Sequence, residues 1–154
     1  MLLVSQTCSA TPSFDSDPAV HICTAVSVID GDPDTLILPQ VNSDCMQPFI
    51  DEVSSRHLDD RIIMVLDGAG WHKVRSLVVP DNMRLVSLQP YLPELNPVEH
   101  LWDELREKAF ANLVFDSLNS LEGHLEISLR AMECDKGRAH SIVAWPWIIN
   151  SFLI

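Results

Sequence analysis

The sequence predicts a mixed α/β fold, in which strands and helices share one hydrophobic core. Turn residues at 30–34 separate two apolar, β-branched runs, which indicates an antiparallel hairpin. The apolar run at 61–66 is typical of a strand buried on both faces, and apolar residues at 97–112 recur at helical spacing. A hairpin followed by alternating strands and helices indicates a mixed sheet flanked by helices. The 154 residues, 47% of them hydrophobic, suit a single domain.

The first elements are a polar lead and the hairpin. Residues 1–18 are predicted to be a disordered lead, because the segment 5–18 is rich in Ser, Thr, Pro and Asp and shows no periodicity. The first strand of the hairpin is expected over 21–29 and the second over 35–38, since both runs are apolar and the residues between them favour a turn.

Two helices and two strands are predicted next. Apolar residues at helical spacing predict a helix from Asn42 or Ser43, either of which suits the N-cap, to residue 57. The buried strand at 61–66 follows. A short helix is expected over 71–79, because Pro80 must end it, and the next strand over 84–88.

The clearest helical pattern lies at 97–112, where one apolar stripe faces charged positions. The residues of the stripe are Val98, Leu101, Trp102, Leu105 and Ala109. A second helix with the same period is predicted over 118–132. The expected domain spans 19–135, and residues 136–154 form a C-terminal apolar tail that either joins the core or meets a partner.

Charge and composition limit the function. A net charge of −12 argues against strong DNA binding by this chain alone, because lysines and arginines that neutralise phosphates supply most non-specific affinity. The apolar tail is interrupted by Pro146 and Asn150 and is too short to span a membrane. The four cysteines are scattered and no secretory signal is present, so we expect reduced thiols and a cytoplasmic protein.

Two carboxylates on rigid elements predict a metal site. Asp67 follows the buried strand, and Glu99 lies in the first turn of the helix at 97–112. Magnesium prefers oxygen ligands and takes few carboxylates, which leaves coordination sites for water and phosphate. Each residue also has a structural interpretation: Asp67 can be a turn residue before Gly68, and Glu99 can complete a capping box with Asn96.

Other polar residues near these two are weaker candidates. His72 and His100 could contact phosphate or metal, but a lone histidine in such a position is more often a packing residue. Glu94 can be a solvated charge in its loop, and Asp103 is expected to pair with Arg106 three residues later. His21 and Cys23 are too few ligands for zinc, which needs four in recognisable spacing.

Two sequence blocks stand out. Residues 64–73 read Met-Val-Leu-Asp-Gly-Ala-Gly-Trp-His-Lys, and residues 88–102 include Leu-Asn-Pro-Val-Glu-His-Leu-Trp. Together they resemble the DDE endonuclease domain of mariner-like bacterial insertion-sequence transposases. The resemblance extends over about 20–129 and implies a ribonuclease-H-like fold. It also implies that Asp67 and Glu99 are the second and third members of a catalytic triad that holds Mg²⁺ or Mn²⁺ during DNA cleavage and strand transfer.

The resemblance also implies that one part of the family's pattern is missing. The family's first catalytic aspartate lies on a strand before the hairpin, where this chain offers only Asp15 and Asp17 in a segment that does not look like a strand. We therefore expect a truncated domain that lacks the first strand and is inactive alone. Its partners would be transposon-end DNA in the intact parent protein, a second copy of itself, or an intact transposase. The alternatives are a non-enzymatic interaction or regulatory module, or another ribonuclease-H-like nuclease.

Overall fold

The computed structural model describes residues 2–10, 20–38, 43–66, 76–88 and 96–152. Its strands are β1 (Leu2–Ala10), β2 (His21–Ser27), β3 (Pro33–Leu38), β4 (Ile62–Leu66) and β5 (Met83–Ser87). Its helices are α1 (Ser43–Arg56), α2 (Pro97–Leu105), the π-helix η3 (Arg106–Phe110), α3 (Leu118–Cys134), α4 (Lys136–Val143) and α5 (Pro146–Phe152). The predicted mixed α/β class is confirmed.

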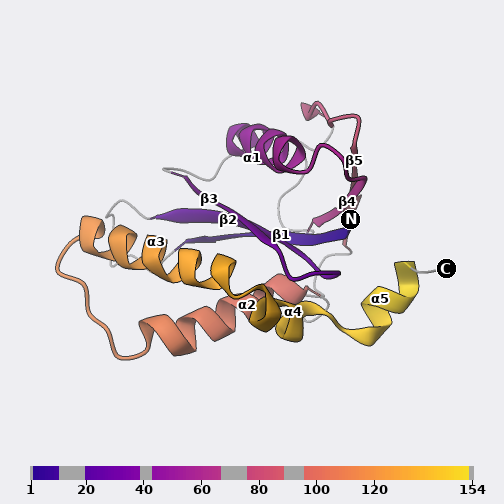
Figure 1. Cartoon of the computed structure of the whole chain (residues 1–154). Helices are drawn as coiled ribbons and strands as arrows, with labels where there is room; N and C mark the ends of the chain where they lie inside the picture. The colour runs from indigo at the N-terminus through magenta and orange to yellow at the C-terminus, as the bar shows by residue number, and fades with distance from the viewer. Residues whose placement is uncertain (1, 11–19, 39–42, 67–75, 89–95, 153–154) are drawn as a thin grey trace.

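The described strands form one sheet in the order β3-β2-β1-β4-β5. The pairs β1–β2 and β2–β3 are antiparallel, whereas β1–β4 and β4–β5 are parallel. Figure 1 shows α1 on one face of this sheet and α2, α3 and α4 on the other. The fold therefore has three layers, with the sheet in the middle.

Each face of the sheet carries its own core. Met46, Phe49 and Ile50 of α1 pack with Met64 of β4 on one face. On the other face, the apolar stripe of α2 packs with β2, α3, α4 and α5. Successive side chains of β4 serve opposite faces, since Met64 belongs to the first core and Val65 to the second. This confirms the prediction that the apolar run at 61–66 is buried on both sides.

The predicted disordered lead is wrong for Leu2–Ala10, and so is the expectation that the sheet lacks a strand before the hairpin. These residues form β1, the central strand of the sheet. Pairing of Val4 with Val26 of β2 and with Val65 of β4 holds the strand from both sides. A strand with two neighbours can form both of its hydrogen-bond ladders, which outweighs the weak local preference of its polar residues.

The predicted helix over 71–79 is wrong at residues 77–79, whereas residue 76 has the conformation of a 3₁₀-helix. Residues 77–80 are not helical. Instead, Gln47 of α1 binds the backbone of Val78 twice, donating through Nε2 to its carbonyl at 2.8 Å and accepting from its N–H at 2.9 Å. This side chain satisfies the backbone groups that a helix would otherwise pair. Residues 71–75 lie outside the described part of the chain.

The predicted apolar tail forms α4 and α5 and joins the core. Ala139, Val143 and Ile148 are each at most 3% exposed. Lys136 at the start of α4 pairs with Asp32 of the hairpin turn at 2.7 Å, and this hydrogen bond holds the pKa of the Lys136 ammonium above its ordinary value. The Lys136 ammonium therefore stays charged at neutral pH, and the ion pair links the C-terminal helices to the hairpin.

A buried carboxylate links β3 to the end of α1. Asp34 is 4% exposed and accepts from His57 Nε2 at 2.7 Å and from Arg56 Nη1 at 3.2 Å. Partial burial lowers the pKa of Arg56, but its hydrogen bonds to Glu52 and Asp34 raise it more, so the pKa lies above its ordinary value. Asp34 therefore always faces a cation.

Replacing Asp34 by alanine is expected to lower the free energy of unfolding by about 2 kcal/mol, mainly because the hydrogen bond to the largely buried His57 is lost. The half-exposed Arg56 should contribute little. Urea unfolding measures the change. Asp103→Ala is the control, because it removes the exposed ion pair with Arg106 and should change stability by no more than about 0.5 kcal/mol. Equal losses of unfolding free energy in Asp34→Ala and Asp103→Ala would contradict the stabilising role of Asp34.

Candidate functional site

Glu99 lies in the first turn of α2, and the start of this helix is fixed by its cap. Asn96 is 1% exposed, and its Oδ1 accepts from the N–H of Val98 at 3.0 Å. Pro97 occupies the first helical position, where it suits the fixed proline backbone. The predicted cap is thus confirmed, and Glu99 is partly exposed beside it.

The buried face of α2 fixes the helix against the sheet. Val98, Leu101 and Trp102 are each at most 5% exposed, and α2 contacts β1 and β2. Burying three such side chains contributes on the order of 5 kcal/mol relative to leaving them in water. Glu99 is therefore attached to a rigid element at the face of the sheet.

Asp67 comes directly after Leu66, the last residue of β4, and lies outside the described residues, as do His72 and Glu94. Leu66 itself is fully buried and pairs with Gln6 of β1 on one side. On the other side, its carbonyl accepts from the N–H of Leu88 at 2.7 Å. The chain thus enters Asp67 from a strand that is held by both neighbours.

The strand beside β4 carries no carboxylate. β1 reads Leu-Leu-Val-Ser-Gln-Thr-Cys-Ser-Ala, and Gln6 is the residue paired with Leu66. Asp15 and Asp17, the acids available before the hairpin, lie outside the described residues. The strand that was expected to be missing is therefore present as β1, but it contains no acidic residue.

The weaker candidates have structural partners. His100 packs against Trp145 with its ring centroid 4.8 Å away, and Asp103 pairs with Arg106 at 2.8 Å, as predicted. Cys23 is buried in the core beneath α1. Among the residues that the structure describes, no three His, Cys, Asp or Glu side chains are grouped closely enough to hold a metal ion.

The carboxylates at 67 and 99 supply the oxygen donors that a magnesium-type ion prefers, so their chemistry fits such an ion. Glu99 is partly exposed, so water can reach its side chain. These two residues are the ones that could hold a divalent cation.

Most basic side chains in the described ranges are paired with acids of the same chain. These residues are Arg56, Arg106, Arg130, Lys136 and Arg138. Paired cations neutralise fewer phosphates, so the internal ion pairs reduce DNA affinity beyond what the net charge of −12 already implies.

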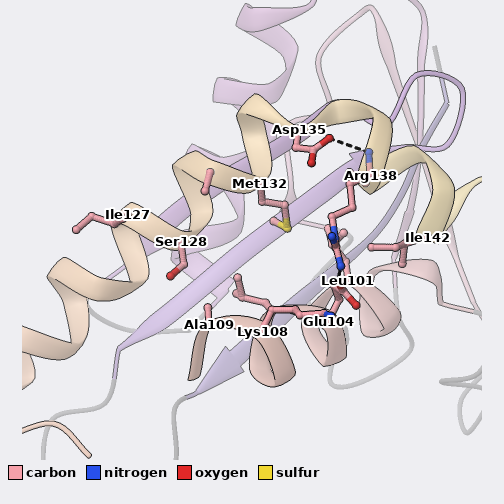
Figure 2. A pocket seen from close by; sticks show the side chains of 13 residues that line it. Leu101, Glu104, Lys108, Ala109, Ile127, Ser128, Met132, Asp135, Arg138 and Ile142 are labelled. Carbon is pink, nitrogen blue, oxygen red and sulfur yellow. Dashed lines mark hydrogen bonds and ion pairs between the residues drawn. The ribbon is translucent and has the colours of Figure 1, made fainter. Parts of the chain in front are cut away.

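A cavity of about 380 Å³ lies between α2, α3 and α4 (Figure 2). Leu101, Met132 and Ile142 line it, and the ion pair between Glu104 and Arg138 closes one side. Glu99 does not line this cavity. Its largely apolar wall is unsuited to a hard cation. No helix within the described ranges is long and apolar enough to cross a bilayer.

The sequence interpretation missed the neighbours of His100. Trp145 and Trp147 flank Pro146, and their ring centroids are 6.0 Å apart. The Trp-Pro-Trp spacing was visible in the sequence, but only the fold of α4 and α5 brings it to the start of α2.

Three comparisons place this chain among known proteins. A family model described as DDE superfamily endonuclease matches residues 6–122. An uncharacterized protein of Sinorhizobium fredii, y4pE/y4sA, is 37% identical over 106 residues, which are 68% of this chain and 78% of that protein. A chain from the cryo-EM structure of a simian T-cell lymphotropic virus intasome with PP2A regulatory subunit B56 gamma superposes with a TM-score of 0.56 at 13% identity. The superposition covers 83% of this chain and 46% of the viral chain, so this chain spans less than half the length of that structural neighbour.

Proposed function

Because this chain belongs to the DDE superfamily of endonucleases, we propose that it is the catalytic domain of a mariner-like insertion-sequence transposase with a ribonuclease-H-like fold. The observation that carries the proposal is the sheet order, in which β1 and β4 lie side by side in the middle and β4 leads into Asp67. The reaction of such a domain is metal-dependent DNA cleavage followed by strand transfer. The fold shared with a chain of a viral intasome supports this assignment.

Asp67 and Glu99 are the proposed metal ligands. Asp67 would bind from the end of β4 and Glu99 from the first turn of α2, and Asn96 would keep Glu99 in place by capping that helix. A bound Mg²⁺ or Mn²⁺ would activate the attacking oxygen and stabilise the leaving oxygen of a phosphodiester. Glu99 also lies in the first turn of α2, at the positive end of the helix dipole.

We propose that this chain is inactive on its own, because β1 provides no carboxylate beside β4. Two carboxylates neutralise less of the charge of two divalent ions than three do, so binding of a second ion should be weak. In this proposal, transposon-end DNA in the cytoplasm is the substrate, and this chain meets the DNA as a homodimer or in a pair with an active transposase.

A non-enzymatic module is the second candidate function. The acid-free β1 and the internally paired basic residues both favour it, since neither would impair a domain that only binds another protein. Such a module would retain the fold without binding metal.

Calorimetric titration with Mn²⁺ separates the two functions. We expect weak binding that Asp67→Asn and Glu99→Gln each reduce at least tenfold, because each removes one of the few ligands. Asp103→Asn is the matched control, since it changes an exposed acid on the same helix, and it should leave binding intact. Absence of metal binding in the unmodified chain would favour the module.

Cleavage of transposon-end DNA tests the proposed inactivity. With Mg²⁺ or Mn²⁺ present, we expect no cleavage above background by the chain alone. Robust cleavage that is abolished by Asp67→Ala would contradict the inactivity and would support the enzyme instead.

A further inference from the structure

The cavity between α2, α3 and α4 opens to solvent. Its floor includes Leu101 and Leu105 of α2, which are 2% and 8% exposed. Ile127 of α3 also lines it and is 69% exposed, so the apolar wall continues onto the surface (Figure 2). Apolar hollows in a protein surface are typical sites for a ligand or a partner.

The loop that joins η3 to α3 presents apolar side chains to solvent. Leu113 is 48% exposed and Val114 is 93% exposed. The next residue, Phe115, packs its ring against Phe110 and His124, with centroid distances of 6.0 and 5.4 Å. We call residues 113–116 the exposed loop. Because Phe115 anchors this loop, little entropy is lost when a partner buries Val114.

The cavity and the exposed loop each carry one exposed charge, and the two charges have opposite signs. Lys108 lines the cavity, and Asp116 ends the exposed loop. Neither side chain forms an ion pair with another residue of the described ranges. The cavity is thus apolar with a cation at its side, and the loop is apolar with an anion at its end.

We propose that the exposed loop of one copy of this chain enters the cavity of a second copy, and that Lys108 of each copy pairs with Asp116 of the other. The loop connects η3 to α3, and both of these elements line the cavity. A surface that carries both a hollow and the side chains to fill it is self-complementary, as a two-fold interface requires. The inference rests on the proposed function for its homodimer, and it assigns no role to Asp67 or Glu99.

A different protein is the alternative occupant of the cavity. The second copy is favoured because the same chain supplies the apolar side chain of Val114 and an acid that matches Lys108. The net charge of −12 on each copy opposes association at long range. At physiological salt, however, such repulsion is screened beyond about 8 Å, whereas the contacts proposed here act at shorter range.

Sedimentation of the full chain at physiological salt, from low to high micromolar concentration, tests the proposal. We expect a dimer that forms as the concentration rises. Lys108→Glu and Asp116→Lys should each weaken it by about tenfold or more, because each brings like charges together at two places. An equimolar mixture of these two variants should dimerise again, since each then meets the opposite charge on the other. A chain that carries both changes should also dimerise.

Val114→Ser tests the apolar part of the interface and should weaken the dimer about tenfold. Val78→Ser is the matched control, because Val78 is 75% exposed and its backbone is bound to Gln47 of α1. This change should leave the dimer intact, and melting curves should show that every variant is folded. A chain that stays monomeric at high micromolar concentration would overturn the proposal. So would a dimer that tolerates both charge reversals, or a mixture of the two variants that stays monomeric.

Calorimetric titration with Mn²⁺ separates this inference from the proposed function. Asp67→Asn and Glu99→Gln should leave the dimer unchanged. If the chain dimerises through Lys108 and Asp116 but binds no Mn²⁺, the interface stands and the metal site fails. If it binds Mn²⁺ but stays monomeric, the interface alone fails.

Discussion

Replacing Gly31 by alanine is expected to lower the free energy of unfolding by about 2–5 kcal/mol, because two unfavourable effects add. Gly31 has a φ of +74°, a conformation that side chains with a Cβ rarely adopt. A Cβ at this position would also lie 2.3 Å from the carbonyl oxygen of Lys136 and 2.4 Å from the N–H nitrogen of His140. Both contacts are with the backbone of α4, which cannot move aside without leaving the hairpin.

Gly123 provides the matched control. It lies inside α3, and a Cβ there would meet nothing within 4 Å. Gly123→Ala should therefore raise the free energy of unfolding by about 0.5–1 kcal/mol, because alanine loses less backbone entropy in a helix. Urea unfolding of both variants measures whether the free energy of unfolding falls in Gly31→Ala and rises in Gly123→Ala. A loss below about 1 kcal/mol in Gly31→Ala would show that α4 does not pack closely on the turn.

Introducing an aspartate on β1 is expected to create metal-dependent DNA cleavage. Gln6→Asp, Thr7→Asp and Cys8→Asp each place a carboxylate on the strand that pairs with β4 next to Asp67. A third ligand for the metal ions is expected to stabilise the transition state by several kcal/mol, which is a rate gain on the order of a hundredfold or more. Because successive residues of a strand face opposite sides, the gain should appear at only some of the three positions.

The control for this gain in cleavage activity introduces an aspartate on β5, the other strand that pairs with β4. Ser87 of β5 pairs with Leu66 from the opposite side and is exposed, so Ser87→Asp should be tolerated and should not restore cleavage. Adding Asp67→Asn to the active β1 variant should abolish the gain. The assay is Mn²⁺-dependent nicking of transposon-end DNA, and no gain at any β1 position would count against the proposed site.

The spacing of apolar residues within one segment was enough to predict the helices and strands in which that spacing is regular. The stripe that includes Trp102 predicted α2, and the continuous run that includes Met64 predicted β4, because each pattern matches one geometry and its burial. The cap at Asn96 followed from the proline after it. These elements also carry Glu99 and lead into Asp67, so both candidate ligands could be found from the sequence.

The missed features depend on partners that are distant in sequence. β1 has little apolar pattern after Val4, and it is a strand because β2 and β4 pair with it. The segment 77–80 is not helical, and Gln47, 31 residues before Val78, binds its backbone. The contact between His100 and Trp145 likewise joins α2 to the segment before α5. Periodicity within one segment carries no information about such contacts.

The central position of β1 has a consequence for biosynthesis. β1 leaves the ribosome before β2 and can pair early with it, yet Leu2 must wait for Ile63 of β4 before the second edge of the strand is covered. Pairing over so long a stretch of chain is slow, and an uncovered strand edge can join another chain. A nascent chain should therefore be most prone to aggregation after the hairpin has emerged and before β4 has, and slower translation of that interval should reduce the yield of folded protein.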